Sequence, residues 1–118
     1  MNNSWVCHLT RTLLLISFYV MSLSEASLDR MLRAIADRSR RRILQVLNER
    51  PPVPRPTPGL CAGEIEQRLH LAQSTISHHM SVLRRAGLIQ SKKQGLWVWY
   101  RRNNASLREL GHDLKKSL

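Results

Sequence analysis

Acidic residues are scarce in this chain of 118 residues. Eight Asp and Glu stand against 19 Lys and Arg, which gives a net charge of +11 and a pI near 11.3. The eight acids are scattered singly, and no Ser-His-Asp, Cys-His or paired-carboxylate arrangement stands out, so the sequence indicates a protein that is not an enzyme. The excess of cations suggests a polyanionic partner, either nucleic acid or an anionic membrane surface. The alternative is an ordinary solvated surface that happens to be basic.

Cysteine is equally rare. Cys7 and Cys61 are the two cysteines of the chain, and two are too few for a disulfide framework, which favours a reducing cytoplasm. A lone cysteine such as Cys61 is more often a small, partly buried residue or a helix cap than a metal ligand. We therefore expect no metal site and no cofactor.

Long apolar runs are also missing. The longest, Leu13 to Leu23, covers about eleven residues, whereas a helix needs roughly 20 to cross a bilayer, so no stable membrane insertion is expected. Residues 1–24 form an apolar N-terminal extension with three open interpretations: translation that begins at Met21, an extra helix in the core or at a dimer interface, or an export signal with a poor cleavage site at residues 24–26.

The remaining residues, 25–118, read as one domain with a proline-rich loop at residues 50–59. All five prolines of the chain lie in this loop, and they exclude the interior of a regular helix or strand. We expect a semi-rigid, extended loop insertion. A peptide-docking role is the alternative, because the spacing of the prolines resembles that of docking motifs.

Apolar periodicity predicts helices before and after this loop, over residues 28–36, 38–48 and 62–70, with a last one over 105–116. Asp37 is a good N-cap for the second. The arginine cluster at residues 40–42 is either a solvated face or a flanking phosphate contact. Leu107, Leu110 and Leu114 give the last helix a narrow stripe that suits either a dimer contact or packing on its own domain.

A further helix is predicted to begin at about residue 73. Ile76, Met80 and Leu83 recur at helical spacing and form one apolar stripe, and Gly87 ends the helix because glycine takes the left-handed cap conformation. The other side carries short hydrogen-bonding groups without acids, as a helix in a DNA major groove would. His78 should face outward with them and His79 toward the domain. The outward polar residues are Gln73, Ser74, Thr75, Ser77 and His78.

Two short runs follow, residues 88–92 and 96–101, joined by residues 93–95. They predict a β-hairpin with a basic tip, with Trp97 and Trp99 on one face and Val98 and Tyr100 on the other. A polar-faced helix followed by a basic hairpin is typical of a winged helix-turn-helix. The expected fold is mostly α with a small β-hairpin (α+β), with about five helices and a two-stranded wing.

Four motifs in this order, Asp37–Leu44, Ala62–Ile65, Ser74–Ile89 and Gly95–Tyr100, resemble the ArsR family of bacterial winged-helix repressors over about residues 28–116. The resemblance implies a homodimer, joined through its N-terminal and C-terminal helices, that represses transcription from a pseudo-palindromic operator in double-stranded DNA. The DNA-binding residues that it and the polar face indicate are Gln73, Ser74, Thr75, Ser77, His78, Arg84, Lys92, Lys93 and Gln94.

The sequence departs from the metal-sensing patterns of that family. Arsenic-type sensors carry a cysteine cluster before the recognition helix, where this chain has Cys61 alone. The zinc-type site needs Asp and His pairs at helical spacing in the last helix, whereas His112 and Asp113 are adjacent and point in different directions. The chain therefore looks closer to the autorepressor branch that lacks metal ligands. The alternatives are a metal- or redox-responsive repressor of the same fold and a basic, membrane-associated interaction module.

Overall fold

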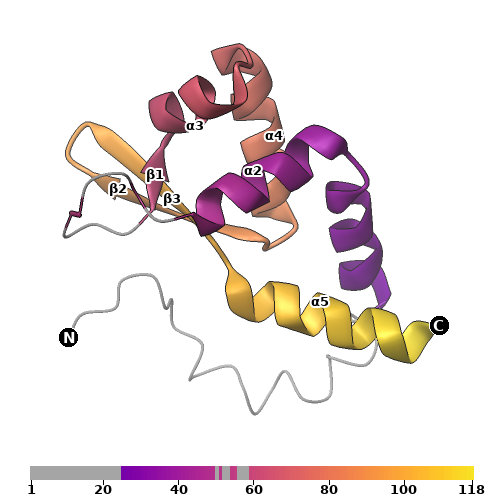
Figure 1. Cartoon of the computed structure of the whole chain (residues 1–118). Helices are drawn as coiled ribbons and strands as arrows, with labels where there is room; N and C mark the ends of the chain where they lie inside the picture. Colours follow the sequence, from indigo (N-terminus) through magenta and orange to yellow (C-terminus); the bar gives the residue numbers. More distant parts are fainter. Residues whose placement is uncertain (1–24, 50, 52–53, 56–58) are drawn as a thin grey trace.

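A computed structural model describes residues 25–49, 51, 54–55 and 59–118. Predictions on residues 1–24 and on most of the proline-rich loop therefore lie outside the described residues. A helix over residues 25–35 is followed by α2 (Arg38–Asn48), α3 (Ala62–Leu69), α4 (Gln73–Arg85) and α5 (Asn104–Ser117) (Figure 1). The strands are β1 (Leu60–Cys61), β2 (Ile89–Gln94) and β3 (Trp97–Arg102). The predicted winged helix-turn-helix is confirmed.

The sheet has one strand more than the predicted two-stranded wing. Its order is β1-β3-β2 and both pairings are antiparallel. In the added pairing, Leu60 lies opposite Tyr100 and Cys61 opposite Trp99. A strand of two residues is too short to show an alternating pattern, so no local signal for β1 exists in the sequence.

The turn of the hairpin also differs from the prediction. Gln94 pairs with Trp97, so the connection is Gly95-Leu96 rather than residues 93–95. Gly95 has a φ of 60° and Leu96 has no positive φ, which is the combination that a type II′ turn requires. Lys93 and Gln94 consequently belong to β2 and not to the loop.

The core is formed by the predicted apolar stripes. Ile43, Ile65 and Leu83 are fully buried, one each from α2, α3 and α4. Ala62, the first residue of α3, is only half-buried. Among the described residues, the buried hydrophobic set is Ala34, Ile43, Leu44, Val46, Leu47, Leu60, Ile65, Leu69, Ile76, Met80, Leu83, Ala86, Leu88, Ile89 and Leu110.

The predicted helix ends are confirmed at both helices that carried a clear signal. The Asp37 carboxylate accepts a hydrogen bond from the Arg40 amide at 3.0 Å and caps α2. Gly87 follows α4 with a φ of 76°, and the Leu88 amide donates to the Leu83 carbonyl at 3.0 Å. Ala72 precedes α4 without a side-chain cap, as its methyl group dictates.

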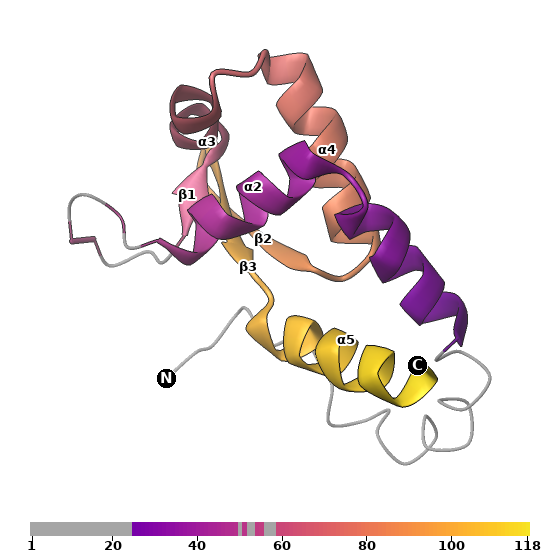
Figure 2. The ribbon, with the colours of Figure 1, turned by 45° about the vertical axis from the view of Figure 1, so that its right-hand side comes forward.

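The helices form the body of the molecule, and the hairpin extends from it (Figure 1). Helices α3 and α5 lie at opposite ends in both views, and the end of α5 lies beside the start of the helix over residues 25–35 (Figure 2). None of the helices that the structure describes combines the length and the hydropathy needed to span a bilayer.

Gly59 lets the chain pass close to β3 as the loop returns to the sheet. Its φ is 102°, and a Cβ added there would collide with the Tyr100 carbonyl oxygen.

We expect Gly59→Ala to lower the free energy of unfolding by more than about 1 kcal/mol, because both the backbone conformation and the contact oppose a side chain. Urea denaturation measures this. Gly63→Ala is the control: a Cβ at Gly63 meets open space in α3, so stability should be unchanged or rise by up to about 1 kcal/mol.

Candidate nucleic-acid interface

Helix α4 presents its polar side to solvent. Ile76, Met80 and Leu83 are 1%, 4% and 0% exposed and fix the helix against the core. With that stripe turned inward, the polar residues on the opposite side of the helix point outward. The five that were predicted to do so are all exposed: Gln73, Ser74, Thr75, Ser77 and His78.

One edge of this polar face meets the hairpin. Ser77, Ser81 and Arg84 line a small hollow of about 90 Å³ together with Tyr100 of β3. These three α4 residues follow one another at helical spacing, so they form the row of α4 nearest the hairpin. The helix face and the wing therefore form one continuous surface, and the predicted Arg84 lies where they join.

The wing residues do not all share one side of the hairpin. Lys92 and Lys93 are neighbours in β2, so their side chains point to opposite faces of the sheet; Lys92 is half-buried opposite Trp99, and Lys93 is exposed opposite Val98. Gln94 is exposed at the end of the strand. The structure thus places Lys93 and Gln94 near the tip, with Lys92 and Gln94 on one face of the hairpin and Lys93 on the other.

The tip itself is apolar, whereas the sequence predicted a basic one. Leu96 is 98% exposed in the turn, and Trp97 is 62% exposed beside it. The sequence signal was available, since a two-residue turn that begins at Gly95 necessarily puts Leu96 at the end of the hairpin.

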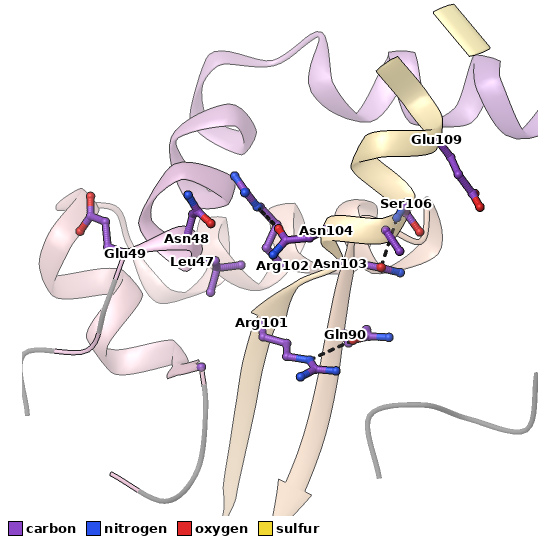
Figure 3. A pocket seen from close by; sticks show the side chains of 12 residues that line it. Leu47, Asn48, Glu49, Gln90, Arg101, Arg102, Asn103, Asn104, Ser106 and Glu109 are labelled. Carbon is purple, nitrogen blue, oxygen red and sulfur yellow. Dashed lines mark hydrogen bonds between the residues drawn. The ribbon is translucent and has the colours of Figure 1, made fainter. Parts of the chain in front are cut away.

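The base of the hairpin is fixed by polar contacts around a hollow of about 780 Å³ (Figure 3). Arg101 Nε donates to Gln90 Oε1 at 3.0 Å across the two strands, and burial lowers the pKa of the Arg101 guanidinium. Asn103 caps α5 by accepting from the Ser106 amide at 3.2 Å, and its Nδ2 donates to the Gly87 carbonyl at 3.1 Å. The ends of α4, β3 and α5 are therefore held together at one point.

His79 faces the domain, as predicted. It is half-buried, and its Nδ1 lies 3.4 Å from Arg40 Nη1. Arg40 also donates to the carbonyl oxygens of Ala34 and Arg33, and Arg41 donates to that of Ile35. Two members of the arginine cluster at residues 40–42 therefore have internal partners, which favours a structural role for them over phosphate contact.

The part of the proline-rich loop that the structure describes is attached to α3 and the sheet. Arg55 Nη2 donates to Glu64 Oε1 at 2.6 Å, and the Arg55 guanidinium carbon lies 5.1 Å from the centre of the Trp99 ring. Glu64 Oε2 accepts from the Cys61 amide at 3.0 Å. Cys61 is the half-buried N-cap residue of α3, so its interpretation as a helix cap is confirmed.

These contacts predict an acid-dependent contribution to stability. Burial alone would raise the pKa of the Glu64 carboxyl, but the hydrogen bonds from Arg55 and the Cys61 amide outweigh it and lower the pKa below its ordinary value near 4.5. A lowered folded-state pKa stabilises the protein above the unfolded-state value, and this contribution is lost as the pH falls through the folded-state pKa. The free energy of unfolding should therefore decline below about pH 5, and Glu64→Gln should make that decline shallower.

Urea unfolding midpoints, measured at a series of pH values from 7 downward, would test the effect of Glu64→Gln on this decline. Glu66→Gln is the control. Glu66 lies on the same helix and has no ion pair among the described residues, so its removal should leave the decline unchanged. Asp37, whose pKa the Arg40 amide lowers, adds a decline of the same sign that both variants keep. Equal profiles for the two variants would contradict the role given to Glu64.

Within the described ranges, no three His, Cys, Asp or Glu side chains come together as metal ligands could. The surface around α4 and the wing is instead cationic, since residues 67–108 contain neither Asp nor Glu. An acid-free surface with an exposed polar helix and a projecting hairpin suits a polyanionic duplex.

Comparisons with known proteins agree with this geometry. Residues 35–91 match a family described as a helix-turn-helix domain. The uncharacterized HTH-type transcriptional regulator YbzH of Bacillus subtilis is 31% identical over 93 residues, which cover 73% of this chain and 93% of YbzH. The arsenical resistance operon repressor of Staphylococcus aureus is 30% identical, with 78% of this chain and 81% of that protein covered.

Among solved structures, an ArsR-like transcriptional regulator from Rhodococcus sp. RHA1 superposes with a TM-score of 0.67 at 26% identity, covering 79% of this chain and 80% of that one. These proteins are transcription regulators and not enzymes, as the sequence indicated for this chain. The chain belongs to the ArsR family of winged helix-turn-helix transcriptional regulators.

Proposed function

We propose that this regulator is a homodimeric repressor that acts in the cytoplasm by binding a pseudo-palindromic operator without a metal inducer. The observation that carries the proposal is the exposed, acid-free polar face of α4, continuous with a basic hairpin. Repression is supported by the operon repressor among its relatives.

In the proposed complex α4 lies in the major groove. Gln73, Ser74, Ser77 and His78 contact base edges, where amide, hydroxyl and imidazole groups can match donor and acceptor patterns. Thr75 and Arg84 lie at the two ends of the helix and contact backbone phosphates, which position a protein without reading sequence. The hairpin adds Lys92, Lys93 and Gln94 as contacts outside the helix.

The dimer contact is proposed at the end of the molecule where α5 meets the helix over residues 25–35 (Figure 2). Leu110 is buried in the domain's own core and Leu107 packs against that core, while Leu114 is half-buried and Leu118 is 97% exposed. The far half of the α5 stripe is therefore open to a second copy. A two-fold dimer would place its two α4 helices about 34–36 Å apart, one turn of DNA.

Independence from metal is supported by the ligand types present. Cys61 is the one cysteine of the described residues and serves as a helix cap. His112 and Asp113 are adjacent on α5 and cannot repeat at the helical spacing that a shared zinc site requires.

Selection of bound duplexes from a random pool tests the proposal. We expect enrichment of an inverted repeat whose half-sites are one helical turn apart, with the same motif after addition of zinc, arsenite or a mild oxidant. Release of the duplex by one of these additives would show an inducible repressor instead. Absence of any enriched motif, together with co-sedimentation on anionic vesicles that a version starting at Met21 loses, would favour the membrane-associated alternative.

Removing the two wing lysines should weaken binding to all DNA sequences alike. Lys92→Ala with Lys93→Ala removes charges that meet phosphates only, so the slope of log affinity against log salt should fall by about 0.9 for each phosphate that is no longer neutralised. Fluorescence anisotropy over a salt series measures the slope. Lys115→Ala with Lys116→Ala removes the same charge from exposed positions on α5 and should leave the slope close to that of the wild type. Equal slopes for both variants would show that the wing does not touch DNA.

A further inference from the structure

A cationic hollow lies on the side of α4 that faces away from the wing. It has a volume of about 560 Å³ and six residues line it. Four of these are arginines, and they come from three different helices. The first described helix contributes Arg30, Arg33 and Ala34, α2 contributes Arg40, and α4 contributes Val82 and Arg85.

Three of the four arginines have no partner for their charge among the described residues. The Arg40 guanidinium is used by the fold, since it donates to two carbonyl oxygens and lies 3.8 Å from the Asp37 carboxylate. Arg30, Arg33 and Arg85 are exposed, and within the described ranges none of their guanidinium groups meets a carboxylate. Like charges around one concavity repel each other unless an anion enters it.

The floor of the hollow is apolar. Ala34 is 1% exposed in the core, and Val82 packs against the core from α4. An apolar floor keeps water from competing fully for the guanidinium groups above it, which strengthens their attraction for an anion. Guanidinium groups bind phosphate through two parallel hydrogen bonds, so a phosphate group suits this rim.

The position of the hollow on α4 identifies which phosphate it would meet. Successive residues turn by about 100° around a helix. Ser77, Ser81 and Arg84 lie on the edge next to Tyr100 of the wing, whereas Val82 and Arg85 lie on the edge next to the first described helix. Ser74 and His78 precede Val82 and Arg85 on the second of these rows, and Gln73 and Ser77 precede Ser81 and Arg84 on the first. The proposed base-reading residues therefore occupy the N-terminal part of both rows, and each row leads to an arginine, with Arg30 and Arg33 beside the second row.

A sugar–phosphate strand borders each side of a major groove. The groove is about 12 Å wide and an α-helix with its side chains fills it, so each edge of the helix approaches one of the two sugar–phosphate strands. We propose that Arg30, Arg33 and Arg85 bind backbone phosphates of the DNA strand across the groove from the wing. This inference rests on the proposed DNA binding and adds a binding site outside the base-reading face and the hairpin.

The test combines Arg30→Gln and Arg33→Gln in the full chain. Both side chains are exposed, so the fold should be retained, which circular dichroism checks. Binding to the selected operator is measured over a salt series and with duplexes that carry single neutral methylphosphonate linkages scanned along both strands. We expect the salt slope to fall by about 0.9 for each phosphate that is no longer neutralised. We also expect that neutral linkages on one strand no longer lower the affinity, whereas those on the other strand still do; this loss of affinity is the sensitivity of a strand.

Three further variants sharpen the result. Arg85→Gln changes a different helix and should remove sensitivity on that same strand, whereas Lys92→Ala with Lys93→Ala should remove it on the other. Arg108→Gln with Lys115→Gln deletes two exposed cations of α5 and should preserve sensitivity on both strands, with the oligomeric state checked by sedimentation.

The outcomes separate this inference from the function on which it rests. If the Arg30 and Arg33 variant keeps the wild-type slope and both strand sensitivities while the wing variant loses one, the arginine site is wrong and DNA binding by α4 stands. If that variant binds DNA normally but no longer binds a polyglutamate peptide, the hollow serves an acidic protein and the phosphate assignment is overturned. If the wild-type protein shows neither sequence preference nor salt dependence, both proposals are wrong.

Discussion

A protein in which Ser77→Ala and His78→Ala are combined is expected to keep binding DNA but to lose most of its preference for the operator. Both side chains are exposed on the outward face of α4, and each good base contact contributes about 1–3 kcal/mol of discrimination. The ratio of operator affinity to scrambled-duplex affinity should therefore fall by at least about tenfold. Nonspecific affinity and the salt slope should persist, because the arginines and lysines that meet phosphates are untouched.

Competition anisotropy with operator and scrambled duplexes measures that ratio. A matched control is Ser106→Ala with His112→Ala, which removes the same two side-chain types from α5 and should leave the preference unchanged. A Ser77 and His78 variant that still selects the operator as well as the wild type does would show that bases are read by another surface.

The largest expected effect on stability comes from Leu83→Ala. Leu83 is 0% exposed and belongs to the stripe that holds α4 on the core. Truncating a buried leucine to alanine costs about 2–5 kcal/mol, because less apolar surface is buried and a cavity remains. Domains of this size are stable by only about 5–15 kcal/mol, so the variant should be partly unfolded in mild denaturant and bind DNA less well in proportion.

Urea unfolding followed by circular dichroism gives the free energies, and Leu96→Ala provides the control. Leu96 is 98% exposed at the tip of the hairpin, so the same chemical change should alter stability by no more than about 0.5 kcal/mol. Similar decreases for the two variants would mean that α4 is not packed as described.

The sequence predicted the parts of the fold that local patterns encode. Helix α2 was predicted with its cap because Asp37 precedes an apolar stripe, and the outward face of α4 followed from the spacing of Ile76, Met80 and Leu83. Both inferences need only the helical period and the chemistry of a cap. The residues proposed to read bases were found in the same way, since short polar groups opposite a buried stripe must point outward.

The parts that the sequence did not predict depend on contacts between distant segments. Strand β1 exists because Leu60 and Cys61 pair with Tyr100 and Trp99, which lie far along the chain, and two residues carry no period of their own. The hollow bordered by arginines likewise requires helices far apart in the chain to lie side by side. The contacts of Arg55 with Glu64 and Trp99 could not be predicted from the sequence, because a loop has no regular spacing from which contact partners follow.

Strand β1 also has a mechanical consequence. It ends at Cys61, α3 begins at Ala62 without any intervening linker, and β1 is paired with β3 of the hairpin. The hairpin is therefore joined to the start of α3 through two paired residues, and Arg55 on Trp99 adds a contact from the loop. The wing is thus not an independent arm, because a change in its orientation would strain a pairing that it shares with the helix-turn-helix.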